Sequence, residues 1–320
     1  MNDSVKYVLA PLAGFTNAAF RRLCAQHGAD LTYTEMVSAA GLAHGSSPTH
    51  HLMEVLPGEG PVACQLFGSK PDELAFSARE VSALNRFVEI NLNAGCPMTK
   101  IVKEGAGAAL LKNPQLVHDC LRAIVQETNL PVTLKTRPGP RPDRVLMLEL
   151  LNAAETAGCK GLALHARFTS QMHGGDVHLD LLAELVQAAK IPITGNGGVT
   201  NRATAERMAT TGVAAIMVGR AALAHPDIFA TLKSGSAPAT CDGADFFREH
   251  LAGLIELRDL LAARYPNDHV PSVDGFVSVA LHTHLFRYFT GRPGAAALRH
   301  RLNSIRTLAE TEALLRTEGL

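Results

Sequence analysis

The sequence predicts a closed (β/α)8 barrel, an eight-stranded TIM barrel, followed by a small all-helical C-terminal domain. Short apolar runs alternate eight times with longer amphipathic segments, and polar or glycine residues follow every apolar run. The alternation stops near residue 229, beyond which only helical patterns occur. Repeated strand–helix units form parallel sheets, and eight units of this length fit a barrel. A doubly wound open sheet is the alternative, but the first strand lacks the G-x-G-x-x-G turn of dinucleotide-binding folds.

Each expected strand is a short apolar run bounded by turn residues. Amphipathic stretches between the strands have the apolar spacing of helices that bury one face, and they lie at residues 16–27, 114–128, 145–157, 179–189 and 202–211. The expected strands are residues 7–10, 31–34, 62–67, 88–92, 132–135, 161–165, 193–195 and 215–218.

The C-terminal part reads as a separate unit. Residues 234–245 are mostly small and polar and contain a proline, which is typical of a linker. Beyond them, residues 246–264, 277–289 and 295–316 have a helical period and are separated by Pro, Gly and Asn. We therefore expect a catalytic barrel over residues 1–233 and a helical domain over residues 246–320.

Composition limits the class of protein. The chain has 320 residues, 47% of them hydrophobic, and a formal net charge of zero. It begins without a signal-peptide pattern, and no apolar run is long enough to span a bilayer. Six cysteines are scattered without a C-x-x-C pair, which argues against a zinc site or a disulfide framework. We expect a cytoplasmic monomer without a metal, in which any nucleic-acid surface is a local patch.

The ends of the last two barrel strands have the pattern of a phosphate site. Asn196 is followed by Gly197 and Gly198, and Gly219 precedes Arg220. Such turns expose backbone N–H groups, and barrels often bind phosphate with the loops after strands seven and eight. Arg220 would add a charge-assisted contact. Tight turns without a ligand are the alternative, but two such loops together favour phosphate.

The residues at other strand ends suit a flavin mononucleotide (FMN) whose phosphate group occupies that site. Pro11, Leu12 and Ala13 form a backbone-rich turn after the first strand, and Gln65 and Lys135 end strands across the barrel mouth. A buried lysine can stabilise negative charge on a reduced flavin, and an amide can both donate to and accept from the ring edge. Lys135 could instead be a snorkelling lysine or a Schiff-base former.

One thiol lies in a stiff turn at the mouth. Cys96 stands between Gly95 and Pro97, just past the fourth expected strand. Glycine allows another group to approach closely, and proline fixes its own φ. An arbitrary cysteine in a turn is usually only packed. A thiol held this stiffly just past the end of a strand is nevertheless well placed to react with a ligand.

With these motifs, the chain resembles the tRNA-dihydrouridine synthases. The most specific part is Asn-x-Gly-Cys-Pro, at residues 93–97, with Lys100 and two glycines after it. The likeness covers the barrel and, more weakly, the helical tail. The matching stretches are residues 9–16, 64–68, 91–100, 105–111, 135–137, 165–167, 195–198 and 218–221.

The resemblance implies that FMN serves to reduce the C5–C6 double bond of a uridine in tRNA, with NADPH as reductant. Cys96 would protonate C5 while hydride is added to C6, and a positioned acid typically contributes about 10²–10⁴-fold in rate. The residues named above for the flavin and its phosphate would contact the FMN. They are Pro11, Leu12, Ala13, Gln65, Lys135, Asn196, Gly197, Gly198, Gly219 and Arg220. His165 would join Lys135 at its reactive side, and Asn91 would orient the uracil.

Reaching a base in folded tRNA requires drawing it out of its stack, so RNA must be held around the mouth. No acidic residue occurs from residue 276 to 307, and Arg299 and Arg306 are seven residues apart, which would place them on one helical side. A solvated basic face is the alternative. The residues expected to contact RNA are Lys100, Arg137, Arg167, Arg287, Arg292 and Arg299.

The chain departs from the family pattern in places, and three other functions are alternatives. After Arg167, Phe168 and His173 stand where the family usually has threonine and tyrosine, which bears on the choice of uridine. The loop at residues 105–107 is expected to close over RNA. An FMN barrel acting on a free pyrimidine or related small molecule would not need a basic tail. A catalytically silent RNA-binding barrel and a flavin-free aldolase-type barrel are further alternatives.

Overall fold

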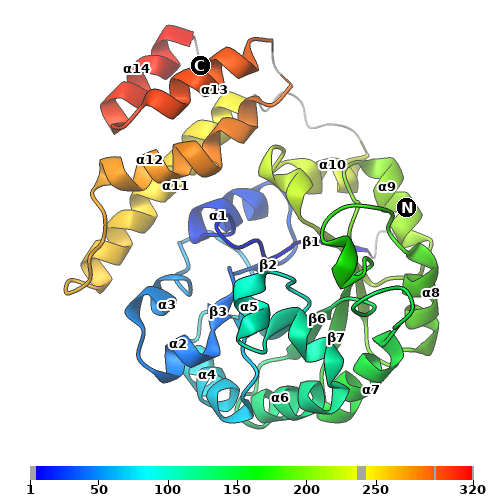
Figure 1. The fold of residues 1–320 in the computed structure, drawn as a ribbon. Helices are drawn as coiled ribbons and strands as arrows, with labels where there is room; N and C mark the ends of the chain where they lie inside the picture. Colours follow the sequence, from blue (N-terminus) through cyan, green and yellow to red (C-terminus); the bar gives the residue numbers. More distant parts are fainter. Residues whose placement is uncertain (1–4, 236–242, 292, 319–320) are drawn as a thin grey trace.

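The expected barrel is confirmed in the computed structural model, which describes residues 5–235, 243–291 and 293–318. Figure 1 shows the strands at the centre of a ring of helices. Eight strands form the wall, and β3 is an additional short strand. The strands are β1 (Lys6–Leu9), β2 (Thr32–Tyr33), β3 (Val37–Ser38), β4 (Val62–Phe67), β5 (Glu89–Ala94), β6 (Val132–Thr136), β7 (Gly161–His165), β8 (Ile193–Asn196) and β9 (Ala215–Val218).

All strand pairs of the barrel are parallel, and the sheet closes on itself. Its order is β1-β9-β8-β7-β6-β5-β4-β2. A parallel bridge between Val8 and Leu31 joins the two ends, and the Leu9 N–H donates to the Leu31 carbonyl at 2.9 Å. Because every strand points the same way, all eight C-terminal ends meet at one mouth.

A short strand, β3, follows the second expected strand and was not itself expected. β2 and β3 both pair with β4, and residues 34–36 between them belong to neither strand. The Thr34 hydroxyl accepts the backbone N–H of Gln65 at 3.0 Å and donates to the Glu35 carbonyl at 2.8 Å. A side chain therefore replaces a ladder bond at this point, and β2 ends before β3 begins.

Helices cover the outside of the barrel because each buries one apolar stripe. In α6, for example, Val117, Leu121 and Ile124 lie three or four positions apart and are all buried. Asn17, Asn113 and Asn201 cap helix N-termini with side-chain hydrogen bonds. The barrel helices are α1 (Ala18–Gln26), α2 (Ala39–Ala43), α3 (Ser47–His51), α4 (Pro71–Ala83), α5 (Thr99–Lys103), α6 (Pro114–Gln126), α7 (Met147–Ala157), α8 (Leu179–Ala188), α9 (Arg202–Ala209) and α10 (Ile228–Ser234).

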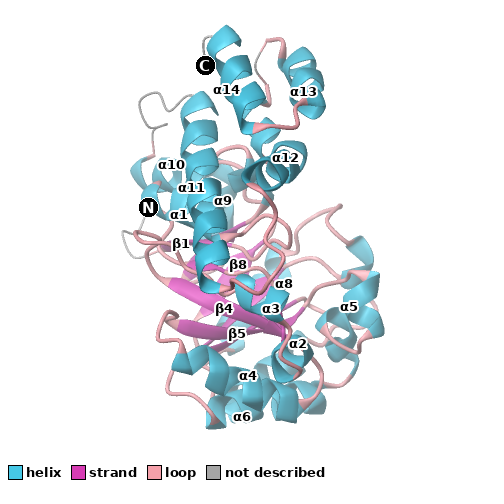
Figure 2. Cartoon of the chain, turned by 90° about the vertical axis from the view of Figure 1, so that its left-hand side faces the viewer, coloured by secondary structure: helices cyan, strands magenta, loops and turns pink. Residues whose placement is uncertain are grey.

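The C-terminal helices stand beside α1, on one flank of the barrel (Figures 1 and 2). Gly253 of α11 meets α1 so closely that an added Cβ would lie 3.0 Å from Cβ of Ala19. Residues 236–242 of the expected linker lie outside the described residues, so the division at 234–245 stays a prediction. The helices are α11 (Gly243–Arg264), α12 (Val273–Thr283), α13 (Ala295–Ser304) and α14 (Leu308–Glu318).

The prediction of one helix over residues 295–316 is wrong, because α13 ends at Ser304 and α14 starts at Leu308. Thr307 caps the second helix by accepting the Glu310 N–H at 3.2 Å. Arg306 lies in the break and donates to the Asn303 carbonyl at 2.7 Å. Arg299 and Arg306 therefore do not share one helical face.

A buried carboxylate fastens the helical part to the barrel. Glu54, which is 1% exposed, accepts hydrogen bonds from Arg86 at 3.0 Å and from the Tyr265 hydroxyl at 2.7 Å. It also pairs with Arg264, the last residue of α11. The contacts with Arg264 and Tyr265 join segments more than 200 positions apart. Among the helices that the structure describes, none has both the length and the apolarity to cross a membrane.

Candidate active site

The Cys96 turn is held from two sides. Oδ1 of Asn93, near the end of β5, accepts the backbone N–H groups of Gly95 at 3.1 Å and Cys96 at 3.0 Å. The Ala108 N–H donates to the Cys96 carbonyl at 2.9 Å. Cys96 itself is half-buried, so its thiol can meet a ligand in the mouth. The strand end and the following 3-10 turn thus fix one accessible thiol.

Gln65 and Asn91 lie below this turn, inside the barrel. Neither is exposed, and Nε2 of Gln65 donates to Oδ1 of Asn91 at 2.7 Å. Nδ2 of Asn93 donates to Oε1 of Gln65 at 2.9 Å. Asn91 uses both ends of its amide within the barrel, so the structure does not support its expected contact with uracil. Asn93, rather than Asn91, lies at the barrel mouth where a uracil would bind. The sequence held a signal for this, because Asn93 is the last residue of the strand that faces into the barrel before the turn.

Lys135, Asn196 and His165 lie next to one another at the barrel mouth, on β6, β8 and β7. Lys135 on β6 is the register partner of Asn93, and its Nζ donates to Oδ1 of Asn196 at 3.1 Å. Burial, helped by the charge of Arg137, lowers the pKa of Lys135 to about 8. His165 pairs in register with Asn196, and burial beside the cations Lys135 and Arg137 keeps its pKa far below the usual range. His165 is therefore neutral at physiological pH.

The two glycines after Asn196 form a cradle beside a cation. Gly197 and Gly198 have φ values of +119° and +72°, which favour glycine. A Cβ on Gly197 would come within 2.9 Å of Cδ2 of His165 and 3.4 Å of Nη1 of Arg167. That Nη1 is buried and makes no hydrogen bond with any part of the chain that the structure describes. A buried guanidinium nitrogen without an acceptor fits an anion such as the FMN phosphate.

Arg167 thus lies beside the glycine cradle rather than on an RNA-facing surface, where it was expected. It is 8% exposed, and its Nε donates to the Gly175 carbonyl at 3.0 Å. Arg220 stands nearby and donates to the His173 carbonyl at 2.9 Å. The His173 ring stacks on His165 with centroids 6.1 Å apart, and sequence reasoning did not include it in the site.

The turn after β1 lies at the same mouth, next to the loop that follows the last strand. Pro11 and Leu12 are half-buried and Ala13 is exposed. A Cβ added to Gly219 would lie 3.7 Å from Cδ2 of Leu12. The structure therefore brings this turn next to the loop after β9, as expected for two walls of one ligand site.

Arg137 is a structural clasp, which corrects its expected role in RNA binding. It is 2% exposed. Its Nε donates to the Gly95 carbonyl at 2.8 Å, and its Nη1 donates to the carbonyls of Arg167 and Phe168 at 3.2 and 3.1 Å. The guanidinium ties the Cys96 turn to the loop after β7 and is not available to a large ligand.

The loop at residues 105–107 is packed rather than free. Gly107 has a φ of +57°, and an added Cβ would lie 2.7 Å from the Cys96 carbonyl oxygen. The expectation that this loop closes over RNA is therefore wrong, because it buttresses Cys96. Lys100, on α5 between the two segments, is exposed and available for contact.

Two expected RNA contacts gather around one aromatic ring of the helical part. The guanidinium carbons of Arg287 and Arg299 lie 5.2 and 4.9 Å from the ring centroid of Phe286. Arg287 also lies 5.3 Å from the ring of Phe15, in the loop after β1. These contacts bring basic side chains to the rim of the mouth. Arg292 lies outside the described residues.

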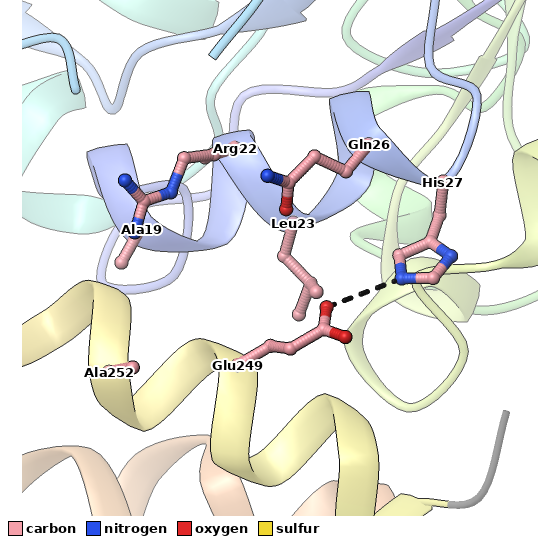
Figure 3. Close-up of a pocket in the computed structure, with 7 residues that line it drawn as sticks. All are labelled: Ala19, Arg22, Leu23, Gln26, His27, Glu249 and Ala252. Carbon is pink, nitrogen blue, oxygen red and sulfur yellow. Dashed lines mark ion pairs between the residues drawn. The ribbon is translucent and has the colours of Figure 1, made fainter. Parts of the chain in front are cut away.

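A separate cavity of about 440 Å³ lies between α1 and α11. Figure 3 shows its lining residues, with His27 and Glu249 paired at 3.5 Å. No strand end contributes to this lining, so the cavity is distinct from the mouth. The lining residues are Ala19, Arg22, Leu23, Gln26, His27, Glu249 and Ala252.

Comparisons with known proteins agree on one family. A family model described as "Dihydrouridine synthase" matches residues 8–319. The chain is 31% identical over 318 residues to "Probable tRNA-dihydrouridine synthase 1" of Synechocystis, covering 96% of this chain and 84% of the relative. It is 32% identical over 307 residues to "tRNA-dihydrouridine synthase B" of Vibrio cholerae, covering 94% and 91%. It is 34% identical over 273 residues to the synthase B of Pseudomonas syringae, covering 82% and 80%. The chain belongs to the dihydrouridine synthase family.

Proposed function

We propose that the protein reduces the C5–C6 double bond of uridine in tRNA to give dihydrouridine. The observation that carries this proposal is the half-buried thiol of Cys96, held in a fixed turn at the barrel mouth. Across the mouth lie a lysine and a neutral histidine, which suit an electron-rich, anionic cofactor and a uracil. The names of the relatives point to the same substrate.

FMN is the proposed cofactor, and NADPH is the proposed reductant. The backbone of residues 197, 198 and 219 would hold the phosphate, together with Arg167 and Arg220. The ring would lie against Pro11, Leu12 and Ala13, with Gln65, Lys135 and His165 at its polar edge. When bound, FMN supplies the hydride that is added to C6 of the uracil. The unsatisfied Nη1 of Arg167 supports this assignment.

Cys96 is the proposed general acid. Its S–H bond breaks as the proton passes to C5, and the thiolate left behind takes a proton from solvent before the next turnover. Asn93 holds the thiol's backbone in place, and Lys135 provides positive charge where negative charge develops. His165, being neutral, can donate or accept one hydrogen bond without adding charge.

The substrate assignment to RNA rests on basic groups at the rim. Lys100 is exposed, and Arg287 and Arg299 surround Phe286. Guanidinium groups bind phosphates, and a partly exposed aromatic ring such as that of Phe286 can stack on a base. A free pyrimidine would need neither, so these residues favour tRNA over a small-molecule substrate.

The test uses purified protein, FMN, NADPH and a tRNA transcript that contains no dihydrouridine. We expect mass spectrometry to detect dihydrouridine with the wild type, and we expect Cys96→Ala to bind FMN but to lose about 10²–10⁴-fold in rate. Cys120→Ala, which alters a buried thiol on α6, is the matched control and keeps the wild-type rate. A wild type that forms no dihydrouridine contradicts the proposed function. Normal turnover by Cys96→Ala excludes the thiol as the acid.

A further inference from the structure

A column of hydrogen bonds runs down the inside of the barrel from the Cys96 turn. Nδ2 of Asn91 donates to the Thr133 hydroxyl at 2.7 Å, and that hydroxyl donates to Oε1 of Glu89 at 2.5 Å. Above Asn91 the column continues through Gln65 to Asn93, as described above. Every member therefore donates toward the floor of the barrel, from the backbone of Cys96 to the carboxylate of Glu89.

The floor end allows only this direction. A carboxylate can only accept, so the Thr133 hydroxyl gives its proton to Glu89 and offers its lone pair upward. Asn91 must then turn its NH2 group to Thr133 and its oxygen to Gln65. Gln65 must in turn direct its NH2 group at the Asn91 oxygen, so its own oxygen accepts the NH2 group of Asn93.

The mouth end requires the same direction independently. The backbone N–H groups of Gly95 and Cys96 can only donate, so Oδ1 of Asn93 must face them. The NH2 group of Asn93 is then directed at Gln65. Both ends agree, and a reversed amide anywhere between them would set two NH2 groups or two oxygens against each other.

We propose that Glu89 and Thr133 are positioning residues of the active site. Together they fix which atom of the Gln65 and Asn93 amides faces the mouth, and so hold the turn that carries Cys96. The amides of Gln65 and Asn93 belong to the proposed FMN and uracil site, so this inference rests on the proposed function. Glu89 and Thr133 lie at the opposite end of the barrel from the ligands and touch neither.

Among the described residues, few other polar groups reach the column, although Nδ2 of Asn93 also contacts Sδ of Met36 at 3.1 Å. The neighbouring barrel interior is apolar and is formed by Val8, Ala63, Ala163 and Met217. The Tyr33 hydroxyl also donates to Oε1 of Glu89, at 2.9 Å, which anchors the carboxylate from a second strand. Burial raises the pKa of Glu89 above its ordinary value, although the hydrogen bonds from Thr133 and Tyr33 oppose this shift.

The test compares two substitutions of Thr133 that separate hydrogen bonding from packing. Thr133→Val keeps the shape but removes the hydroxyl, whereas Thr133→Ser keeps the hydroxyl and removes a methyl group. We expect Thr133→Val to raise the FMN dissociation constant roughly tenfold, on the scale of one lost hydrogen bond, and Thr133→Ser to stay near wild type. Glu89→Leu and Glu89→Gln form a second pair, and only the leucine removes the acceptor.

A second readout needs no flavin. In the FMN-free protein, NMR of the side-chain NH2 groups of Gln65, Asn91 and Asn93 reports their exchange with solvent. We expect slow exchange in the wild type and Thr133→Ser, and faster exchange in Thr133→Val. Thr194→Val is the control, because the Thr194 hydroxyl on β8 bonds to no residue that the structure describes.

The outcomes separate the two proposals. Equal FMN affinity and equal amide exchange in the valine and serine variants would overturn the positioning role. Weaker FMN binding in Thr133→Ser alone, with wild-type binding in Thr133→Val, would also overturn it, because packing would then be the cause. If the wild type binds no FMN, the proposed function fails, while the NMR comparison still decides whether the column is set by Thr133.

Discussion

At the scale of single residues, position along a strand was easier to predict than side-chain environment. The sequence located Cys96, Lys135 and the glycine cradle because strand ends in a parallel barrel meet at one mouth. It did not show that Arg137 is enclosed by three carbonyls, since those carbonyls come from distant loops. The choice of Asn91 over Asn93 failed for a similar reason. Both face inward, and Asn93 is the one that reaches the turn, where it accepts the backbone N–H groups of Gly95 and Cys96.

Lys135 provides a prediction at this scale. Its pKa is lowered to about 8 in the folded protein, from 10.5 without burial. The unfolded chain therefore binds more protons between these pH values, so wild-type stability rises with pH there. We expect Lys135→Met to stabilise the FMN-free protein to urea most below pH 8, with the gain shrinking toward pH 10.5. Lys112→Met, at an exposed position, serves as control. A pH-independent difference would contradict the burial of a charged lysine.

At the scale of elements, strands and barrel helices followed from periodicity, whereas breaks set by side chains did not. The interruption after β2 depends on the Thr34 hydroxyl replacing a ladder bond. The break between α13 and α14 depends on the Thr307 cap. In both cases a polar side chain replaces the backbone in one hydrogen bond. The hydrophobic pattern of the sequence does not predict where this happens.

The Arg137 clasp gives a prediction for the loops after β5, β6 and β7. Arg137→Met leaves three carbonyl groups, two of them fully buried, without their donor, so we expect a loss of about 3 kcal/mol in the free energy of unfolding. Urea denaturation measures it. Arg141→Met is the matched control, because the Arg141 side chain is 66% exposed and forms a surface ion pair with Asp143. If the two variants were equally stable, the clasp would not hold the loops together.

At the scale of the whole molecule, the helical part is joined to the barrel by contacts between residues far apart in sequence. Glu54 meets Arg264 and Tyr265, and α11 lies along α1. No local pattern predicts such pairs, so the sequence indicated a helical unit but not where it docks. Its docking brings Arg287 onto Phe15 at the mouth, which connects the basic helical surface with the catalytic one.

That connection predicts how tRNA binding depends on salt. We expect Arg299→Gln to weaken tRNA binding and to reduce the slope of log affinity against log salt concentration by about 1. Arg316→Gln is the control, because Arg316 on α14 pairs with Glu312 four positions away. Titration of labelled tRNA at several salt concentrations measures both slopes. Equal slopes for Arg299→Gln and the wild type would show that Arg299 makes no phosphate contact.

The central claim is that this protein forms dihydrouridine in tRNA through Cys96. The most direct measurement is a map of dihydrouridine in cellular tRNA from a strain that lacks the gene, complemented with the wild type or with Cys96→Ala. We predict that dihydrouridine disappears from at least one tRNA position on deletion and returns with the wild-type gene, but not with Cys96→Ala. An unchanged dihydrouridine map after deletion, or full restoration by Cys96→Ala, would contradict the account.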